Sequence, residues 1–327
     1  MLLRFFKSNQ QANIILMPVL FLALWLPSLI KPDLIQFRFD QYPAPLYSII
    51  KPVFDNYPFL GVLITFILLI STSLLLIRLN ILFFFINTRT QLPALLYLLI
   101  TSSYIPLQQG NPAIIAALFL VFALFRIFDS FKKEGLAYNY FDAALLLSFG
   151  SLFYFNLIFL LPLTWVALIV LRQPRWREWA FTVIGAVLPY IFLFSYNYLR
   201  GHSFDLVISN FGNLLIHTNT LKFSHPFIIF MGFVVILVIV ASLHMVRIFA
   251  SKKIHSRKYF VLFLAIFINL LLLYFIIPGA GIELIFMTAI PATYLISHYY
   301  INIKTGFWSE ISFIFLIFMV IYIRATA

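Results

Sequence analysis

The chain has 327 residues, of which 63% are hydrophobic and only 10% are charged, and its net charge is +12. A soluble globular protein carries roughly 25% charged residues, so this chain has too little polar surface to fold around one core in water. Its 40 Phe and 17 Tyr exclude a disordered or nucleic-acid-binding chain. With no cysteine, disulfides and thiol chemistry are excluded. The composition predicts a polytopic membrane protein.

Long apolar runs without alternation predict transmembrane helices, because about 20 apolar residues are needed to cross roughly 30 Å of hydrocarbon. Their lack of alternation excludes a β-barrel. We expect an all-α, polytopic helical bundle that forms a single integral membrane domain over residues 1–327. The first run has no small-residue cleavage site after Trp25, which favours a retained signal-anchor helix. We expect about 11 helical segments, including a short broken pair: 14–30, 58–77, 92–107, 112–128, 142–155, 157–171, 179–199, 226–247, 259–277, 282–299 and 309–324.

The placement of Lys and Arg predicts the orientation of these segments. With a cytoplasmic N-terminus, the inner segments hold 16 of these residues and the outer segments hold 6, as the positive-inside rule requires. We therefore expect a multi-pass protein of the bacterial inner (cytoplasmic) membrane. The positive charge is explained by orientation and by attraction to anionic lipid headgroups, so membrane lipids are expected partners and nucleic acid is not.

Residues 142–171 are predicted to form two short helices, because Asn156 and Pro162 interrupt the apolar run. A break that faced lipid would leave backbone groups without hydrogen bonds, so both residues are expected inside the bundle or beside a cavity. Residues 79–87 are too short to cross the membrane. They are expected to extend the second segment or to lie along the inner surface.

Two predicted outer loops, 31–57 and 200–225, are long enough to build a site. The first carries Asp40 between Arg38 and Tyr42, where aromatic neighbours would desolvate the carboxylate and suit it to act as a general base. The alternative is an aspartate that is solvated or paired with Arg38. The apolar stretch Leu46–Ile50 predicts a short helix at the membrane surface.

Glu283 follows the sequence Pro-Gly-Ala-Gly at the outer end of a predicted span. An ionisable group at this depth is a candidate functional residue, although it could instead complement the helix dipole. The second outer loop could also supply metal ligands, but their spacings of 3, 12 and 8 residues match no zinc pattern. We therefore expect no metal and no other cofactor. The ligand candidates are His202, Asp205, His217 and His225.

The order of these parts resembles the polytopic glycosyltransferases that use lipid-phosphate sugar donors. The resemblance covers about residues 1–200: a first span, an outer loop with an acid, a surface helix at Pro43–Ile50, and a short-helix pair with a basic turn from Phe155 to Trp179. The sequence departs from the pattern in having Asp40 where an acidic pair is usual, and in having no large C-terminal soluble domain.

This resemblance implies an enzyme that moves a sugar from a polyprenyl-phosphate donor onto an acceptor at the outer face. Asp40 would be the catalytic base, and Arg200 or Lys222 would hold the donor phosphate. Arg38, Tyr42 and Glu283 are the further substrate-binding candidates.

Two other functions stay open, and so does the question of whether the protein is an enzyme. One is a non-catalytic scaffold or partner subunit with a degenerate site, and the other is a lipid or small-molecule transporter. A cavity under the 31–57 loop would favour glycosyl transfer, whereas a central cavity reachable from both sides would favour transport. The composition and the turn Arg172–Trp179 also resemble an uncharacterised family of inner-membrane proteins of Bacteroidota, which implies no activity.

Overall fold

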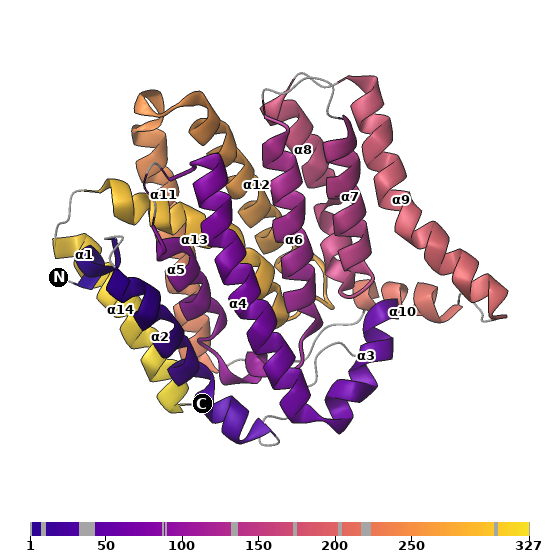
Figure 1. Ribbon diagram of the computed structural model, residues 1–327, viewed down its shortest axis with the longest axis horizontal. Helices are drawn as coiled ribbons and strands as arrows, with labels where there is room; N and C mark the ends of the chain where they lie inside the picture. The colour runs from indigo at the N-terminus through magenta and orange to yellow at the C-terminus, as the bar shows by residue number, and fades with distance from the viewer. Residues whose placement is uncertain are drawn as a thin grey trace.

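Figure 1 shows the computed structural model, which describes residues 2–7, 11–32, 43–86, 88, 90–131, 137–172, 175–201, 205–216, 224–303 and 307–326. The regular structure of these residues is entirely helical, which confirms the predicted all-α bundle. Within the described ranges, seven helical segments are long and apolar enough to cross a membrane, so this is a multi-pass membrane protein. They are α4 (Pro58–Phe83), α6 (Pro112–Asp129), α9 (Trp176–Leu199), α11 (His225–Arg247), α12 (Ile254–Ile276), α13 (Ile285–Asn302) with the preceding turn η5 (Ile282–Leu284), and α14 (Phe307–Thr326).

The remaining helices complete the bundle. They are α1 (Leu2–Lys7), α2 (Gln11–Ile30), α3 (Pro45–Asn56), α5 (Leu92–Thr101), η2 (Ile105–Gln108), α7 (Ala137–Ser151), η3 (Phe155–Leu160), α8 (Leu161–Leu171), α10 (Asp205–Ile216) and η4 (Phe249–Ser251). The central helix is α13, which packs against α5, α6, α11 and α12. Its side chains are buried nearly all round, as expected of a helix that is apolar on every face.

One end of the bundle, at the bottom of Figure 1, carries both α3 and α10. The Asn210 side chain of α10 donates a hydrogen bond to the Pro43 carbonyl just before α3, at 3.3 Å. The N–H of Leu46 donates to the carbonyl of Leu152 at the end of α7, at 2.9 Å. We call this the α3–α10 end. The two predicted outer loops therefore lie on the same side of the bundle.

The predicted short pair in residues 142–171 is confirmed as α7 and α8, joined through η3. Asn156 in η3 is fully buried, as predicted. The expectation for Pro162 is wrong, because it is exposed. It lies in the first turn of α8, where a proline removes no helical hydrogen bond. Its exposure to lipid therefore leaves no backbone group unsatisfied.

The predicted span 92–107 is also shorter in the structure, because α5 ends at Thr101. The chain leaves the helix at Ser102 and is extended at Tyr104, and the separate short helix η2 then begins with Pro106 in its first turn, a position that favours proline. Side chains from distant helices satisfy carbonyls of this segment. Thr65 donates to the Gln109 carbonyl at 2.7 Å, and Arg324 donates to the Ser102 carbonyl at 2.9 Å. Non-helical backbone is tolerated within a membrane domain when protein shields it in this way.

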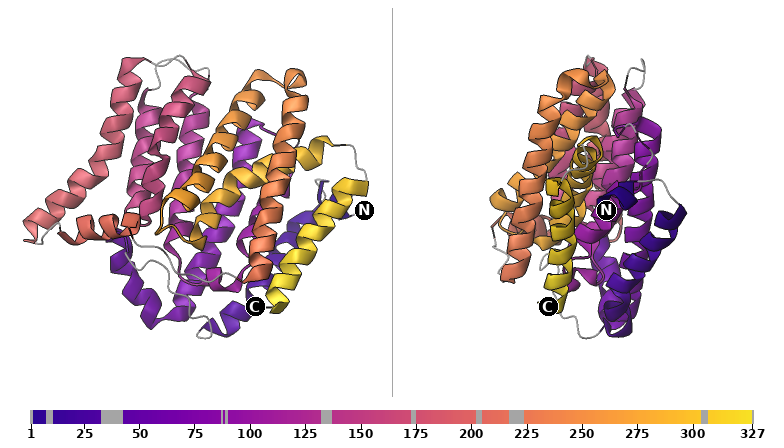
Figure 2. Two further views of the ribbon diagram at one scale, coloured as in Figure 1. Left: turned by 180° about the vertical axis from the view of Figure 1, so that it is seen from behind. Right: turned by 90° about the vertical axis from the view of Figure 1, so that its left-hand side faces the viewer.

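The helix α9 lies along the outside of the bundle and packs mainly on α7. The two backbones come close at Gly185, where a Cβ atom would lie 2.4 Å from the carbonyl oxygen of Phe141. Pro189 interrupts the helical hydrogen bonding one turn later, and prolines at such positions bend helices. Figure 2 shows the second half of α9 leaning away from the bundle. This departure separates the end of α9 from α7.

Candidate functional site

An apolar cleft of about 460 Å³ lies between α3, α7 and α9 at the α3–α10 end. Ile49 and Phe192 stand at its rim, with 69% and 68% of their surfaces exposed. One wall is α3, which belongs to the predicted outer loop 31–57. The other wall is the half of α9 that leans away after Pro189. The lining residues are Leu46, Ile49, Leu145, Phe149, Leu152, Leu188, Pro189, Phe192, Leu193 and Tyr196.

Arg200 gives the rim of this cleft a positive charge. It follows the last residue of α9 and is exposed. Its guanidinium carbon lies 5.3 Å from the ring centroid of Tyr196, in a cation–π contact. Because Tyr196 lines the cleft, the stacking places the cation beside the apolar walls. An apolar cleft with an arginine at its edge matches a lipid that has an anionic head.

Glu283, like Arg200, is a predicted substrate-binding residue that the structure describes. Its side chain is 1% exposed, and it folds back onto Gly281, where a Cβ atom would lie 2.3 Å from Oε2. The Tyr154 hydroxyl and the backbone N–H of Glu283 itself interact with the carboxylate. However, neither oxygen has a hydrogen bond of ordinary geometry to the described residues. Such a group is costly inside a membrane domain.

Asn156 places a second polar side chain in the same buried region. It is fully buried, and neither its amide oxygen nor its nitrogen has a hydrogen-bond partner among the described residues. It lies two residues beyond Tyr154, in η3, which packs against α12. Phe155 of η3 also contacts Phe211 of α10, with ring centroids 5.5 Å apart. Thus α10 covers the segment that carries Tyr154 and Asn156.

Among the described residues, the structure places the two predicted substrate-binding residues, Arg200 and Glu283, in different parts of the bundle. Arg200 stacks on the free end of α9, whereas Glu283 lies inside the bundle against Gly281. Asp205 and His225 begin α10 and α11 respectively. The remaining candidates lie outside the described residues: Arg38, Asp40, Tyr42, His202, His217 and Lys222.

Sequence reasoning missed Tyr196 and Tyr154 as parts of these two sites. The signal for Tyr196 was present, since an aromatic four residues before an arginine at a helix end can stack beneath it. For Tyr154 there was no local signal, because its interaction with Glu283 joins residues that are far apart in the chain.

Seven apolar spans, a buried central helix and a lipid-facing cleft define a polytopic α-helical membrane protein. The chain belongs to a family of unknown function, DUF6427, which it matches over residues 46–327. It matches no curated protein and no solved structure. The family match includes Arg200, Lys222 and Glu283 and begins after Asp40.

Proposed function

We propose that this protein binds a polyprenyl-phosphate sugar donor in the cleft between α3, α7 and α9. With Asp40 as the base, it would transfer the sugar at the outer face of the bacterial inner membrane. The observation that carries the proposal is the cleft itself, since it is apolar and lies under α3 with Arg200 at its rim. This is where glycosyl transfer from a lipid-linked donor requires a cavity.

The cleft suits the two chemically different parts of such a donor. Its apolar walls would take the isoprenoid chain directly from the bilayer, because exposed Ile49 and Phe192 form a rim open to lipid. The guanidinium of Arg200 would pair with the phosphate through charge-assisted hydrogen bonds. An arginine is suited to this position because it can bind two phosphate oxygens at once.

In the transfer step, the Asp40 carboxylate would accept the proton of an acceptor hydroxyl. The acceptor oxygen would then form a bond to the anomeric carbon of the sugar, and the bond from that carbon to the phosphate oxygen would break. The leaving group is the polyprenyl phosphate, whose negative charge Arg200 would stabilise.

A second candidate function is lipid-phosphate binding without catalysis. The residues that line the cleft include no carboxylate, so the described walls account for binding alone. A membrane scaffold or partner subunit that holds a lipid phosphate would need Arg200 and the apolar walls, but not Asp40. The two candidates therefore make different predictions for Asp40→Asn.

The test uses the full chain in phosphatidylcholine nanodiscs and compares a polyprenyl phosphate with the polyprenol that lacks the phosphate. We expect Arg200→Gln to weaken binding of the phosphate by about tenfold, since a charge-assisted hydrogen bond is worth about 1.5–3 kcal/mol. Polyprenol binding should be unchanged. The matched control is Arg177→Gln, because Arg177 stacks on Trp176 at the start of the same helix and away from the cleft.

Asp40→Asn should leave donor binding intact and reduce sugar transfer by roughly 100-fold or more, the usual contribution of a positioned base. Suppose that Asp40→Asn fully complements a deletion strain and Arg200→Gln does not complement it. This result would reject glycosyl transfer and support lipid-phosphate binding without catalysis. Equal binding of polyprenol and polyprenyl phosphate by the unmodified protein would reject both candidates.

A further inference from the structure

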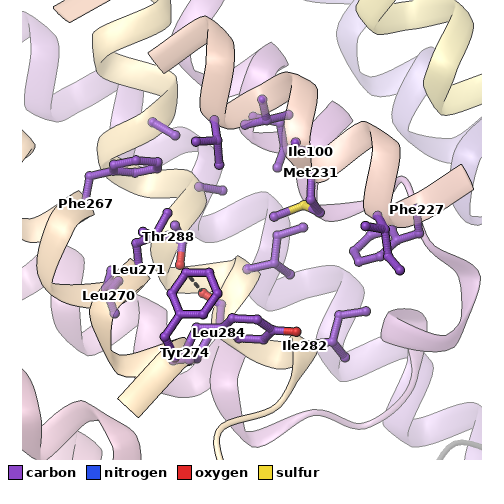
Figure 3. A pocket seen from close by; sticks show the side chains of 18 of the residues that line it. Ile100, Phe227, Met231, Phe267, Leu270, Leu271, Tyr274, Ile282, Leu284 and Thr288 are labelled. Carbon is purple, nitrogen blue, oxygen red and sulfur yellow. Dashed lines mark hydrogen bonds between the residues drawn. The ribbon is translucent and has the colours of Figure 1, made fainter. Parts of the chain in front are cut away.

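A second apolar cavity, of about 370 Å³, lies between α11 and α12 and has α13 as its floor. Figure 3 shows side chains from these helices around it. Phe227, Met231 and Gly232 come from α11, Tyr274 comes from α12, and Thr288 comes from α13. The volume falls within the range of about 300–1,000 Å³ that is usual for ligand sites.

The cavity opens toward lipid. Ile228 and Phe275, which line it, have 51% and 73% of their surfaces exposed, and they belong to two of the membrane-spanning helices. The floor is shielded, since Ala289 and Ala292 of α13 are each only 1% exposed. The surrounding medium at this depth is hydrocarbon. An apolar cavity of this kind does not hold ordered water.

The polar groups of the cavity lie where they distinguish one of its ends from the other. The Thr288 hydroxyl donates a hydrogen bond to the Leu284 carbonyl at 2.8 Å, so its donor is already used. Tyr274 lies in the last turn of α12. The turn that carries Gly281 and Ile282 also lines the cavity. Figure 3 shows the Tyr274 ring beside Ile282 and Leu284.

Tyr274 therefore presents an amphipathic ring at the end of the cavity nearest the α3–α10 end. Tyrosine is the side chain typical of the interface between hydrocarbon and headgroups.

We propose that this cavity is a binding site for one hydrocarbon chain of a membrane lipid, which enters between α11 and α12. The lipid head lies at Tyr274 and the chain runs over Thr288 and Ala292 toward the middle of the membrane. Lipid is the occupant because the rim is exposed in two spanning helices and the walls are apolar. The site is separate from the cleft beside α9 and does not depend on the function proposed for that cleft.

The experiment reconstitutes the full chain in phosphatidylcholine vesicles in which one acyl chain carries a photoactivatable diazirine. We expect cross-links on Ala289 and Ala292, which a lipid chain reaches only through the cavity. Phe286 and Ile290 of the same helix are fully buried and do not line the cavity. They report the background, whereas exposed Ile239 on α11 reports ordinary contact with the bilayer.

Gly232→Trp tests whether the lipid chain reaches Ala289 and Ala292 through the cavity. A Cβ atom at Gly232 has no atom within 4 Å, so the indole can extend into the open space without displacing the backbone. We expect cross-linking of Ala289 and Ala292 to fall by about tenfold, because occupying an overfilled cavity typically costs about 1–3 kcal/mol. Gly212→Trp on α10, where a Cβ also meets open space, should leave this cross-linking unchanged.

Unchanged cross-linking at Ile239 shows that each variant is folded and inserted. Cross-linking of Ala289 and Ala292 at the level of Phe286 and Ile290 in the unmodified protein would overturn the proposal. So would full cross-linking of these alanines in Gly232→Trp.

Discussion

The carboxylate of Glu283 occupies the space that a side chain at residue 281 would need. A Cβ atom there would lie 2.3 Å from Oε2 and 2.6 Å from Oε1. The backbone of Gly281 has φ −102° and ψ −175°, which other residues also adopt. The glycine is therefore required by the neighbouring acid and not by its own conformation.

Gly281→Ala is expected to lower the free energy of unfolding by about 1–3 kcal/mol, because the buried carboxylate must move within a packed interior. The measurement is the midpoint of thermal unfolding in detergent micelles. Gly232→Ala is the control, since a methyl group there meets no atom within 4 Å.

Combining Gly281→Ala with Glu283→Ala tests whether the Glu283 carboxylate is the group that a methyl group at residue 281 would meet. The double variant should lose less stability than the sum of the two single losses, because alanine at 283 leaves room for the new methyl group. Strict additivity would mean that the carboxylate is not what the methyl group meets.

At the scale of elements, α10 is fixed to the bundle mainly through its own C-terminal half. The Gly279 N–H donates to the Leu214 carbonyl at 3.0 Å, and Phe211 packs on Phe155 and Phe159 of η3. A Cβ atom at Gly279 would lie 2.5 Å from that same carbonyl oxygen. Thus α10 can pack against the turn between α12 and α13 without a steric clash only when residue 279 is glycine.

Gly279→Ala should loosen α10 without unfolding the bundle, because the clash is with the backbone of a separate surface helix. A single cysteine at the buried position Leu214 would report this, since the chain has no cysteine of its own. We expect maleimide labelling of that cysteine to be about tenfold faster, corresponding to about 1.4 kcal/mol of lost docking. Gly212→Ala, on an open face of α10, should leave the labelling rate unchanged.

The shape of α9 determines the width of the cleft that Arg200 borders. Pro189→Ala restores the hydrogen bond to the Gly185 carbonyl and should straighten the helix. We expect the distance between spin labels at Asn56 of α3 and Asn197 of α9 to change and polyprenyl-phosphate binding to weaken. Pro226→Ala should alter neither measurement, because Pro226 lies in the first turn of α11, where proline does not bend a helix.

The sequence predicted the long helices well because unbroken apolar runs have few alternatives in a membrane. It did not predict α10, whose Ser209, Asn210 and Gly212 dilute the apolar pattern and which gains its order from contacts with η3. It placed the end of α5 too late, since Leu107 and its neighbours are apolar but belong to the separate short helix η2. An apolar run indicates that a segment is buried, but it does not show where a helix within that segment ends.

The candidate site was harder to predict than the fold. Arg200 and Glu283 were identified from their positions at the ends of spans, and Arg200 stacks on Tyr196, which lines the cleft. Their separation could not be foreseen, because it depends on the direction in which α9 leaves the bundle after Pro189. The interaction of Tyr154 with Glu283 likewise depends on how distant helices pack.

At the scale of the whole molecule, the bundle has two chemically different ends. Basic side chains gather at the end opposite to α3 and α10, where Lys258 donates to the Leu171 carbonyl at 3.1 Å. Arg172 pairs there with Glu178 at 3.1 Å. The positive-inside rule predicts that this end is cytoplasmic.

Reporter fusions test this orientation. Fusions after Lys133 and after Arg257 should be active as cytoplasmic reporters, and fusions near Asp40 and His217 should be active as external ones, because the basic segments resist translocation. A cytoplasmic signal at His217 would invert the arrangement from α9 onward.

The shortness of α5 has a consequence for how the protein enters the membrane during synthesis. This helix has 10 residues, so at about 1.5 Å per residue it covers only about half of the hydrocarbon thickness. It packs on α4 and α13, and of these two helices only α4 precedes it in the chain. We therefore expect α5 to enter the bilayer together with α4, and deleting α4 should leave α5 outside the bilayer.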